Sequence, residues 1–117
     1  MDKKESLSAI EWPPERLRAL DRAVADARGW TGGRLVKGYV PELWRTPDGT
    51  LRSLSAVSLG TGETFVLQDE ARIHVSYDAG TGLWFADHQA EQESHGPTIP
   101  IAICLAYLAS KGRVFNG

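Results

Sequence analysis

Cysteine is almost missing from this chain of 117 residues, since Cys104 is the only one. No disulfide can therefore form within the chain, which is typical of proteins in a reducing compartment. The longest apolar run, residues 99–109, is about half of what a bilayer-spanning helix needs. The N-terminus is charged and is not followed by an apolar run, so no signal peptide is predicted. We expect a cytoplasmic protein without a membrane partner.

An excess of charge of one sign is also missing. The 13 Lys and Arg residues nearly balance the 15 Asp and Glu residues, which leaves a net charge of −2. Nucleic-acid binders usually carry a basic excess, so a nucleic-acid partner is not expected. Hydrophobic residues make up 42% and charged residues 24% of the chain, close to globular averages. These totals predict a flexible N-terminal segment at 1–14 and a single domain at 15–117.

Catalytic and cofactor motifs are missing as well. The glycine-rich segments form neither a phosphate-binding loop nor a dinucleotide fingerprint, and no serine stands in a G-x-S-x-G motif. The three histidines lack the close spacing of zinc ligands. They are His74, His88 and His95. Cys104 stands in an apolar segment that disfavours a thiolate, so we predict a core residue. We expect no enzyme, no metal and no cofactor.

One helix is predicted over residues 15–28, where apolar side chains recur three or four positions apart. They are Leu17, Leu20, Val24 and Ala27. Asp21 falls among the polar residues that are expected to face water, and Gly29 is expected to end the helix.

A second helix is predicted over residues 100–111, with Thr98 as its N-cap and Gly112 after its end. This segment is apolar nearly all round and carries no charge before Lys111. We therefore expect it to be buried on most sides, by the sheet and by a partner helix or a partner subunit.

The middle of the chain is predicted to be rich in strands. Strands are expected at 35–40, 51–59 and 63–67. Loops or turns are expected at 31–33, 46–49, 60–62 and 91–96. The connections are too short for parallel crossovers. The predicted fold is therefore α+β: one antiparallel sheet of about four to five strands, with an N-terminal and a C-terminal helix packed on it.

The clearest hairpin joins residues 71–77 to residues 83–89, because apolar and polar side chains alternate in the first strand. If Tyr77 faces Leu83, one face of the hairpin is core. That face carries Ile73, Val75, Tyr77, Leu83 and Phe85. The opposite face then carries Arg72, His74, Trp84 and His88. A large aromatic side chain beside cations suits a nucleotide-like ligand or a partner's side chain, so these four residues are the predicted binding site. The alternative is that the chain covers this face itself, or that water does.

Four tryptophans are many for so short a chain, and Trp30 and Trp44 fall in predicted loop or edge segments. Exposed aromatic side chains are enriched at protein interfaces, so these two are candidate interface residues. Packing over the edges of the sheet is the alternative of equal weight.

Two segments resemble a known family. Leu20-Asp21-Arg22-Ala23-Val24-Ala25, followed by Gly29-Trp30, is similar to the start of small phage-encoded domains, the phage ABA sandwich group and its NinX-like relatives. The segment from Pro100 to Leu108 resembles the alanine-rich closing helix of the same group. The resemblance covers most of residues 15–112. It implies a phage or prophage accessory protein in a bacterial cytoplasm, with no catalytic residues to carry over.

These observations lead to two functional hypotheses. The first is a non-enzymatic phage accessory protein that binds a host protein or a nucleotide-like small molecule, for example as an inhibitor of host defence. The second is a structural or assembly subunit that forms a homodimer through its apolar C-terminal helix.

Overall fold

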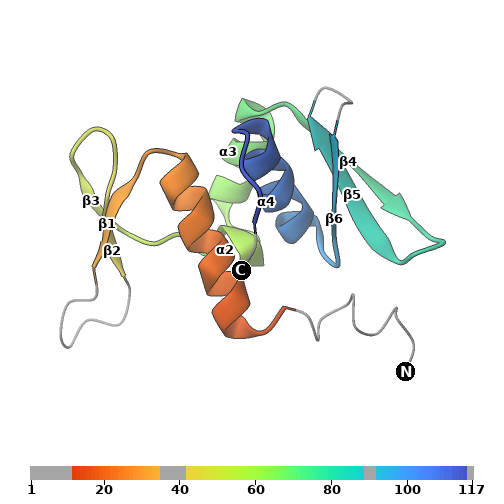
Figure 1. Cartoon of the computed structure of the whole chain (residues 1–117), viewed down its shortest axis with the longest axis horizontal. Helices are drawn as coiled ribbons and strands as arrows, with labels where there is room; N and C mark the ends of the chain where they lie inside the picture. Colours follow the sequence, from red (N-terminus) through yellow and green to blue (C-terminus); the bar gives the residue numbers. More distant parts are fainter. Residues whose placement is uncertain (1–11, 35–41, 89–91, 116–117) are drawn as a thin grey trace.

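The computed structural model describes residues 12–34, 42–88 and 92–115 of the chain. In this part of the chain the elements are α2 (Pro14–Ala27), β1 (Thr31–Arg34), β2 (Leu43–Arg45), β3 (Leu51–Ser53), the 3₁₀ helix η2 (Val57–Leu59), α3 (Gly62–Glu70), β4 (Ile73–Asp78), β5 (Leu83–His88), β6 (Gln92–Gly96) and α4 (Ile99–Ser110). The strands form two antiparallel sheets, β1-β2-β3 and β4-β5-β6. Figure 1 shows the sheets at opposite ends of the molecule, with the helices between them. The α+β class is confirmed, but the prediction of one sheet is wrong.

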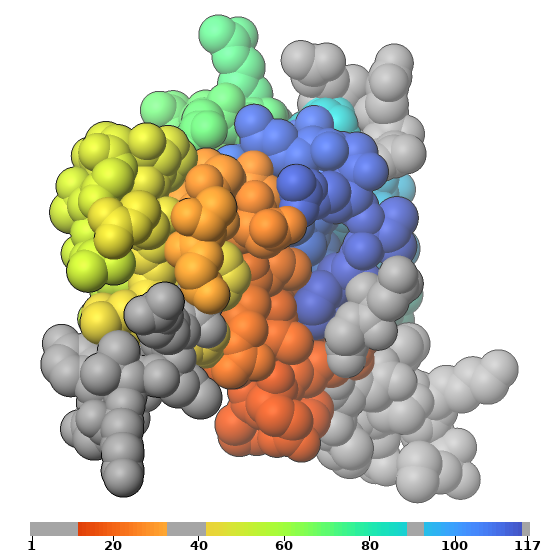
Figure 2. Space-filling model, turned by 60° about the vertical axis from the view of Figure 1, so that its left-hand side comes forward, coloured from red at the N-terminus to blue at the C-terminus, as the bar shows by residue number. Residues whose placement is uncertain are grey.

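Helix α2 follows the predicted spacing. Leu20 and Val24 are buried on its inner side, and Gly29 ends it in the left-handed region, at φ +85°. Figure 2 shows the surface of α2 between the yellow strands β2 and β3 on one side and the blue end of α4 on the other. The helix therefore joins the first sheet to the rest of the molecule.

Residues 51–67 differ most from the predicted structure. Strand β3 ends at Ser53, and the predicted strand at 63–67 is helix α3. The Thr64 hydroxyl explains why helix α3 begins here. It accepts a hydrogen bond from the Thr61 N–H (3.0 Å) and donates one to the Val57 carbonyl (2.7 Å). Thr64 and Leu67, three positions apart, are then buried. Tertiary burial at helical spacing therefore overrides the β propensity of the Phe-Val-Leu run.

Two predicted loops are strands, and one predicted strand is not described. Residues 31–33 belong to β1, and residues 92–96 form β6 at the edge of the second sheet. The predicted strand at 35–40 lies outside the described residues. The turn at 46–49 is confirmed, with the Gly49 N–H donating to the Thr46 carbonyl (2.9 Å). Edge strands are often polar, which is why β6 reads as a loop in the sequence.

The hairpin β4–β5 is confirmed, but its predicted register is wrong by one residue. Tyr77 pairs with Trp84, and Ile73 pairs with His88. The turn explains the shift, because the Asp78 carboxylate accepts from the Gly80 N–H (3.0 Å) and from the Thr81 hydroxyl (2.9 Å). This bonding keeps Asp78 in the ladder and shortens the loop to residues 79–82. A shift by one residue turns every side chain of β5 to the other face.

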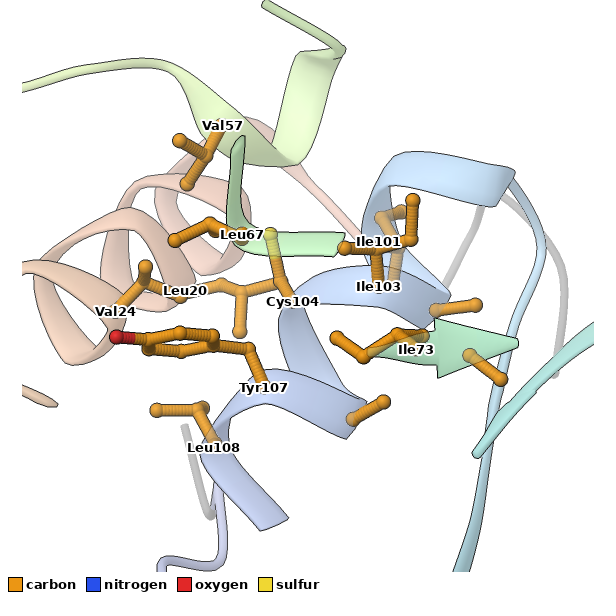
Figure 3. Packing of buried hydrophobic residues seen from close by; sticks show 13 residues of the cluster. Leu20, Val24, Val57, Leu67, Ile73, Ile101, Ile103, Cys104, Tyr107 and Leu108 are labelled. Carbon is orange, nitrogen blue, oxygen red and sulfur yellow. The ribbon is translucent and has the colours of Figure 1, made fainter. Parts of the chain in front are cut away.

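Helix α4 lies at the centre of the main core. Its side chains meet those of α2, η2, α3 and the second sheet (Figure 3). The buried residues are Leu20, Val24, Val57, Leu67, Ile73, Ala86, Ile101, Ala102, Ile103, Cys104, Ala106, Tyr107 and Leu108. The predicted N-cap is confirmed, since Thr98 Oγ1 accepts from the Ile101 N–H (3.4 Å). The predicted burial on most sides is confirmed too, and the covering elements belong to this chain. Burial also raises the pKa of the Cys104 thiol, as expected of a core cysteine.

Trp30 and Trp44 form a second, smaller core with Ala25 and Leu54. Only 4% of Trp30 and 9% of Trp44 is exposed. The alternative of packing over the sheet is therefore correct, and neither side chain is available as an exposed interface residue.

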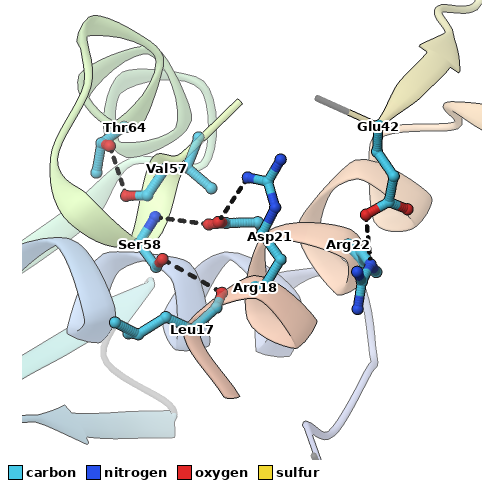
Figure 4. A network of polar contacts seen from close by, with 8 residues as sticks. All are labelled: Leu17, Arg18, Asp21, Arg22, Glu42, Val57, Ser58 and Thr64. Atoms are coloured by element: carbon cyan, nitrogen blue, oxygen red, sulfur yellow. Dashed lines mark hydrogen bonds and ion pairs between the residues drawn. The ribbon is translucent and has the colours of Figure 1, made fainter. Parts of the chain in front are cut away.

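A buried polar network joins α2 to η2 (Figure 4). Asp21, which was predicted to face water, is 3% exposed. Its carboxylate accepts from the Ser58 N–H (2.9 Å) and pairs with Arg18 (3.5 Å). Burial raises the pKa of Asp21, although the bonds from Ser58 and Arg18 act in the opposite direction. Asp21 therefore fixes the segment that leads into α3.

We predict that Asp21→Ala destabilises the fold by about 1–3 kcal/mol, because it leaves the buried Ser58 N–H without an acceptor. Asp21→Asn keeps an acceptor oxygen and should lose less. Urea denaturation followed by circular dichroism measures both variants. Equal losses in the two would show that the hydrogen bond to Ser58 is not the reason.

Gly96 lets β6 approach α4 closely. A Cβ atom at this position would lie 2.8 Å from the backbone nitrogen of Ala102 and 2.9 Å from Cγ2 of Ile101. We predict that Gly96→Ala destabilises the fold by about 1–3 kcal/mol through this overlap. Gly62→Ala is the matched control, since nothing lies within 4 Å of a Cβ there. It should leave the melting temperature unchanged or raise it, and a comparable loss in both variants would contradict the prediction.

Candidate functional site

The structure separates the four residues of the predicted binding site. His74 lies on the face of the second sheet opposite to the core, because it alternates with Ile73 and Val75. Trp84 and His88 share the core-side face but lie at opposite ends of β5. The prediction that all four residues share one face is therefore wrong.

Arg72 and His88 do come together, at a cleft beside the end of α4. The cleft has a volume of about 370 Å³. Its lining comes from the end of α3, the turn into β4, the end of β5 and the end of α4. The lining residues are Glu70, Ala71, Arg72, His88, Tyr107, Ser110 and Lys111. Most of these groups are polar, and the volume is at the lower end of the range for small-molecule sites.

Arg72 is held at the rim of this cleft by a tight turn. Its backbone N–H donates to the Asp69 carbonyl (3.3 Å), and the N–H of Ala71 donates to the Leu67 carbonyl (3.0 Å). The Gln68 amide donates to the carbonyl of Ile73 on the other side of the turn (3.4 Å). These contacts place Arg72 at φ +54°, a left-handed conformation that is uncommon for residues other than glycine.

The cations of the cleft are not neutralised by the protein. Within the described residues, neither Arg72 nor Lys111 forms an ion pair. Lys111 lies over the Tyr107 ring, with Nζ 5.4 Å from the ring centroid. Nδ1 of His88 is buried and has no hydrogen-bond partner among the described residues. Glu70 is the acid of the lining, and its side chain is exposed. The cleft therefore offers several donors and an excess of positive charge.

Tyr107 forms part of the wall of the cleft with its ring. Its hydroxyl end lies toward Val24 of α2 (Figure 3), so the ring is what Lys111 meets. Burial raises the pKa of Tyr107, the charge of Glu70 raises it further, and Arg28 acts against both. The phenol therefore stays protonated at neutral pH.

Sequence reasoning found Arg72 and His88 but missed Lys111 and Tyr107 as site residues. In the sequence, Lys111 is only the end of a helix and Tyr107 is only one of its apolar residues. Their place beside Arg72 depends on how α4 packs against α3 and β4, and no local pattern carries that information.

A second hollow of about 370 Å³ lies at the other end of α4. Its lining is mostly apolar and includes no charged side chain. The lining residues are Trp12, Leu17, Ser58, Leu59, Pro97, Thr98, Pro100 and Ile101. It lacks the directed donors of the cleft at Arg72, so we take that cleft as the candidate site.

No family model, curated protein or solved structure matches this chain. In the described ranges, no three His, Cys, Asp or Glu side chains lie close enough together to hold a metal ion. No helix in the same ranges is long and apolar enough to cross a membrane.

An ion-pair cluster holds the start of α3, the helix that ends at the cleft. The Glu63 carboxylate pairs with Arg28 (2.5 Å) and with Arg52 (2.7 Å). Burial alone would raise the pKa of Glu63, but hydrogen bonds from Arg28 and Ser55 and the charges of Arg28 and Arg52 outweigh it. The net shift is downward from the ordinary value of 4.5. The ionised carboxylate is therefore favoured by folding.

We predict that Glu63→Gln lowers stability at neutral pH. Because the pKa of Glu63 is lower in the folded state, its contribution is complete above the unfolded value of about 4.5 and is lost as the pH falls through the folded value. The difference in stability between wild type and variant should therefore disappear over that acid range. Urea midpoints measured from pH 7 to pH 3 test this, with Glu93→Gln on the exposed side of β6 as the control. A gap that does not depend on pH would contradict the prediction.

Proposed function

We propose that this protein is a non-enzymatic binding protein that holds a small anionic, nucleotide-like ligand in the cleft at the end of α4. One observation carries the proposal: Arg72 in the turn before β4, His88 at the end of β5 and Lys111 just after α4 line one polar cleft. Arg72 and Lys111 have no ion-pair partner among the described residues. Convergent, unpaired donors in a concave site are typical of anion recognition.

The chemistry of the lining suits a ligand with a charged group and a flat or apolar part. The Arg72 guanidinium presents a planar fork of donors, whereas Lys111 supplies a compact charge on a flexible stem. The Tyr107 ring adds an apolar surface beside them. A nucleotide-like molecule combines an anionic group with a flat base that can lie against such a surface.

The resemblance of the two terminal helices to phage ABA sandwich and NinX-like proteins supports a biological setting. We place the protein, within this proposal, among phage or prophage accessory proteins of the bacterial cytoplasm. There it would sequester a small signalling molecule, as an inhibitor of host defence does.

A host protein is the second candidate ligand class, and exposed apolar side chains favour it. Phe65 and Val66 on α3 are 61% and 50% exposed, and Leu59 of η2 is 68% exposed. Apolar groups of this size on a surface are common at protein-binding sites.

The hypothesis of a homodimer through α4 is no longer favoured, because the apolar faces of α4 are covered by this chain's own elements.

Isothermal titration calorimetry at low salt tests the proposal, with AMP and inorganic phosphate as probes. We expect both to bind, and Lys111→Ala to weaken AMP binding by about tenfold or more, since a charged hydrogen bond contributes about 1.5–3 kcal/mol. Arg45→Ala removes an exposed cation of the first sheet and is the matched control. Absence of binding at millimolar concentration, or equal weakening in both variants, would overturn the proposal and favour a protein ligand.

A further inference from the structure

We infer that Arg72 is the specificity-determining residue of the cleft, that it selects a phosphate group over a carboxylate, and that the protein keeps it at a cost in folding stability. This inference rests on the proposed function and names the class of ligand, a phosphomonoester.

The backbone conformation of Arg72 is one that the fold elsewhere gives to glycine. Among the described residues with φ in the left-handed region, every other one is a glycine. They are Gly29, Gly32, Gly49, Gly60, Gly82 and Gly112. An L-residue in this conformation brings its Cβ close to its carbonyl oxygen, which costs free energy that glycine avoids. Position 72 therefore carries a residue that is unfavourable for its own turn.

Nothing in the described fold compensates for that cost. The Arg72 side chain is exposed, and it makes no ion pair or side-chain hydrogen bond with the described residues. The turn is held by backbone and Gln68 contacts that a glycine would also allow. A strained residue that adds nothing to the fold is commonly found at functional sites. Because Arg72 lines the cleft, a role in ligand binding would explain why arginine and not glycine stands at this position.

The arrangement of donors favours a phosphate. A guanidinium binds two oxygens of one phosphate through parallel hydrogen bonds. Lys111, on the α4 side of the cleft, and His88, at the end of β5, can then approach a third oxygen from other directions. A carboxylate has two oxygens in one plane, so it cannot satisfy donors from three elements equally well. Glu70 limits the excess of positive charge in the lining, so recognition depends on directed hydrogen bonds more than on net charge.

Two substitutions separate the strain from the recognition. Arg72→Gly removes the strain and the guanidinium together, whereas Arg72→Lys keeps the strain and the charge but removes the fork. We expect Arg72→Gly to raise the melting temperature by about 3–6 °C and to weaken AMP binding by at least about tenfold. Arg72→Lys should melt at the wild-type temperature and also bind AMP more weakly. Arg45→Ala should leave AMP binding unchanged.

The ligands are compared on the wild-type protein by calorimetry. AMP should bind at least about tenfold more tightly than adenosine-5′-carboxylate, which differs from it at the anionic group, and adenosine should not bind. If no probe binds to the wild type, the proposed function fails and the inference fails with it. If AMP binds but Arg72→Gly binds it equally well, or melts at or below the wild-type temperature, only the inference is overturned. Equal binding of AMP and the carboxylate would overturn the selection of phosphate.

Discussion

The structure depends on the burial of one uncharged helix. Between Ile99 and Ser110, α4 has no charged side chain to offer to water, so the chain must cover it on nearly every side. The second sheet, α2, η2 and α3 meet this requirement together. Apart from the half-buried Leu105, α4 reaches the surface near its two ends, and the two hollows described above lie at those ends. The cleft is therefore a by-product of how the core is closed, and Lys111 stands in it because the helix ends there.

Polar contacts complete what the apolar core begins. Apolar packing alone would let α3 slide along α4, but Asp21 fixes Ser58, and Thr64 fixes Val57. Glu63 then connects the start of α3 to Arg28 of the α2 end and to β3. Because α3 is nine residues long, a helix anchored at its start leaves little freedom to the turn at its end. The backbone of Arg72 is thus held by the contacts of its own turn and, through α3, by bonds formed well away from the cleft.

Features of the fold could be predicted from the sequence where the residues that decide them lie within the same segment. Spacing and caps predicted α2 and α4, because Leu20, Val24 and Thr98 act within their own segments. The register of the hairpin could not be predicted, since it depends on whether Asp78 joins the ladder or the turn. Helix α3 was missed because the burial of Thr64 and Leu67 decides the structure against the β propensity of Thr64, Phe65 and Val66. Two of the seven lining residues of the candidate site were predicted for the wrong reason. Arg72 and His88 meet through tertiary packing, and the shared strand face was an error.

The central place of α4 also has a consequence for biosynthesis. Every helix and strand that covers α4 precedes it in the chain. During synthesis on the ribosome, the elements that surround the core are therefore made before the helix at its centre. The contacts of α4 with α2 span most of the described sequence, and such long-range contacts form late. Until residue 110 has left the exit tunnel, Leu20, Val24, Leu67 and Ile73 lack the apolar cover that α4 gives them in the folded protein. We expect this protein to fold after, rather than during, the synthesis of its domain.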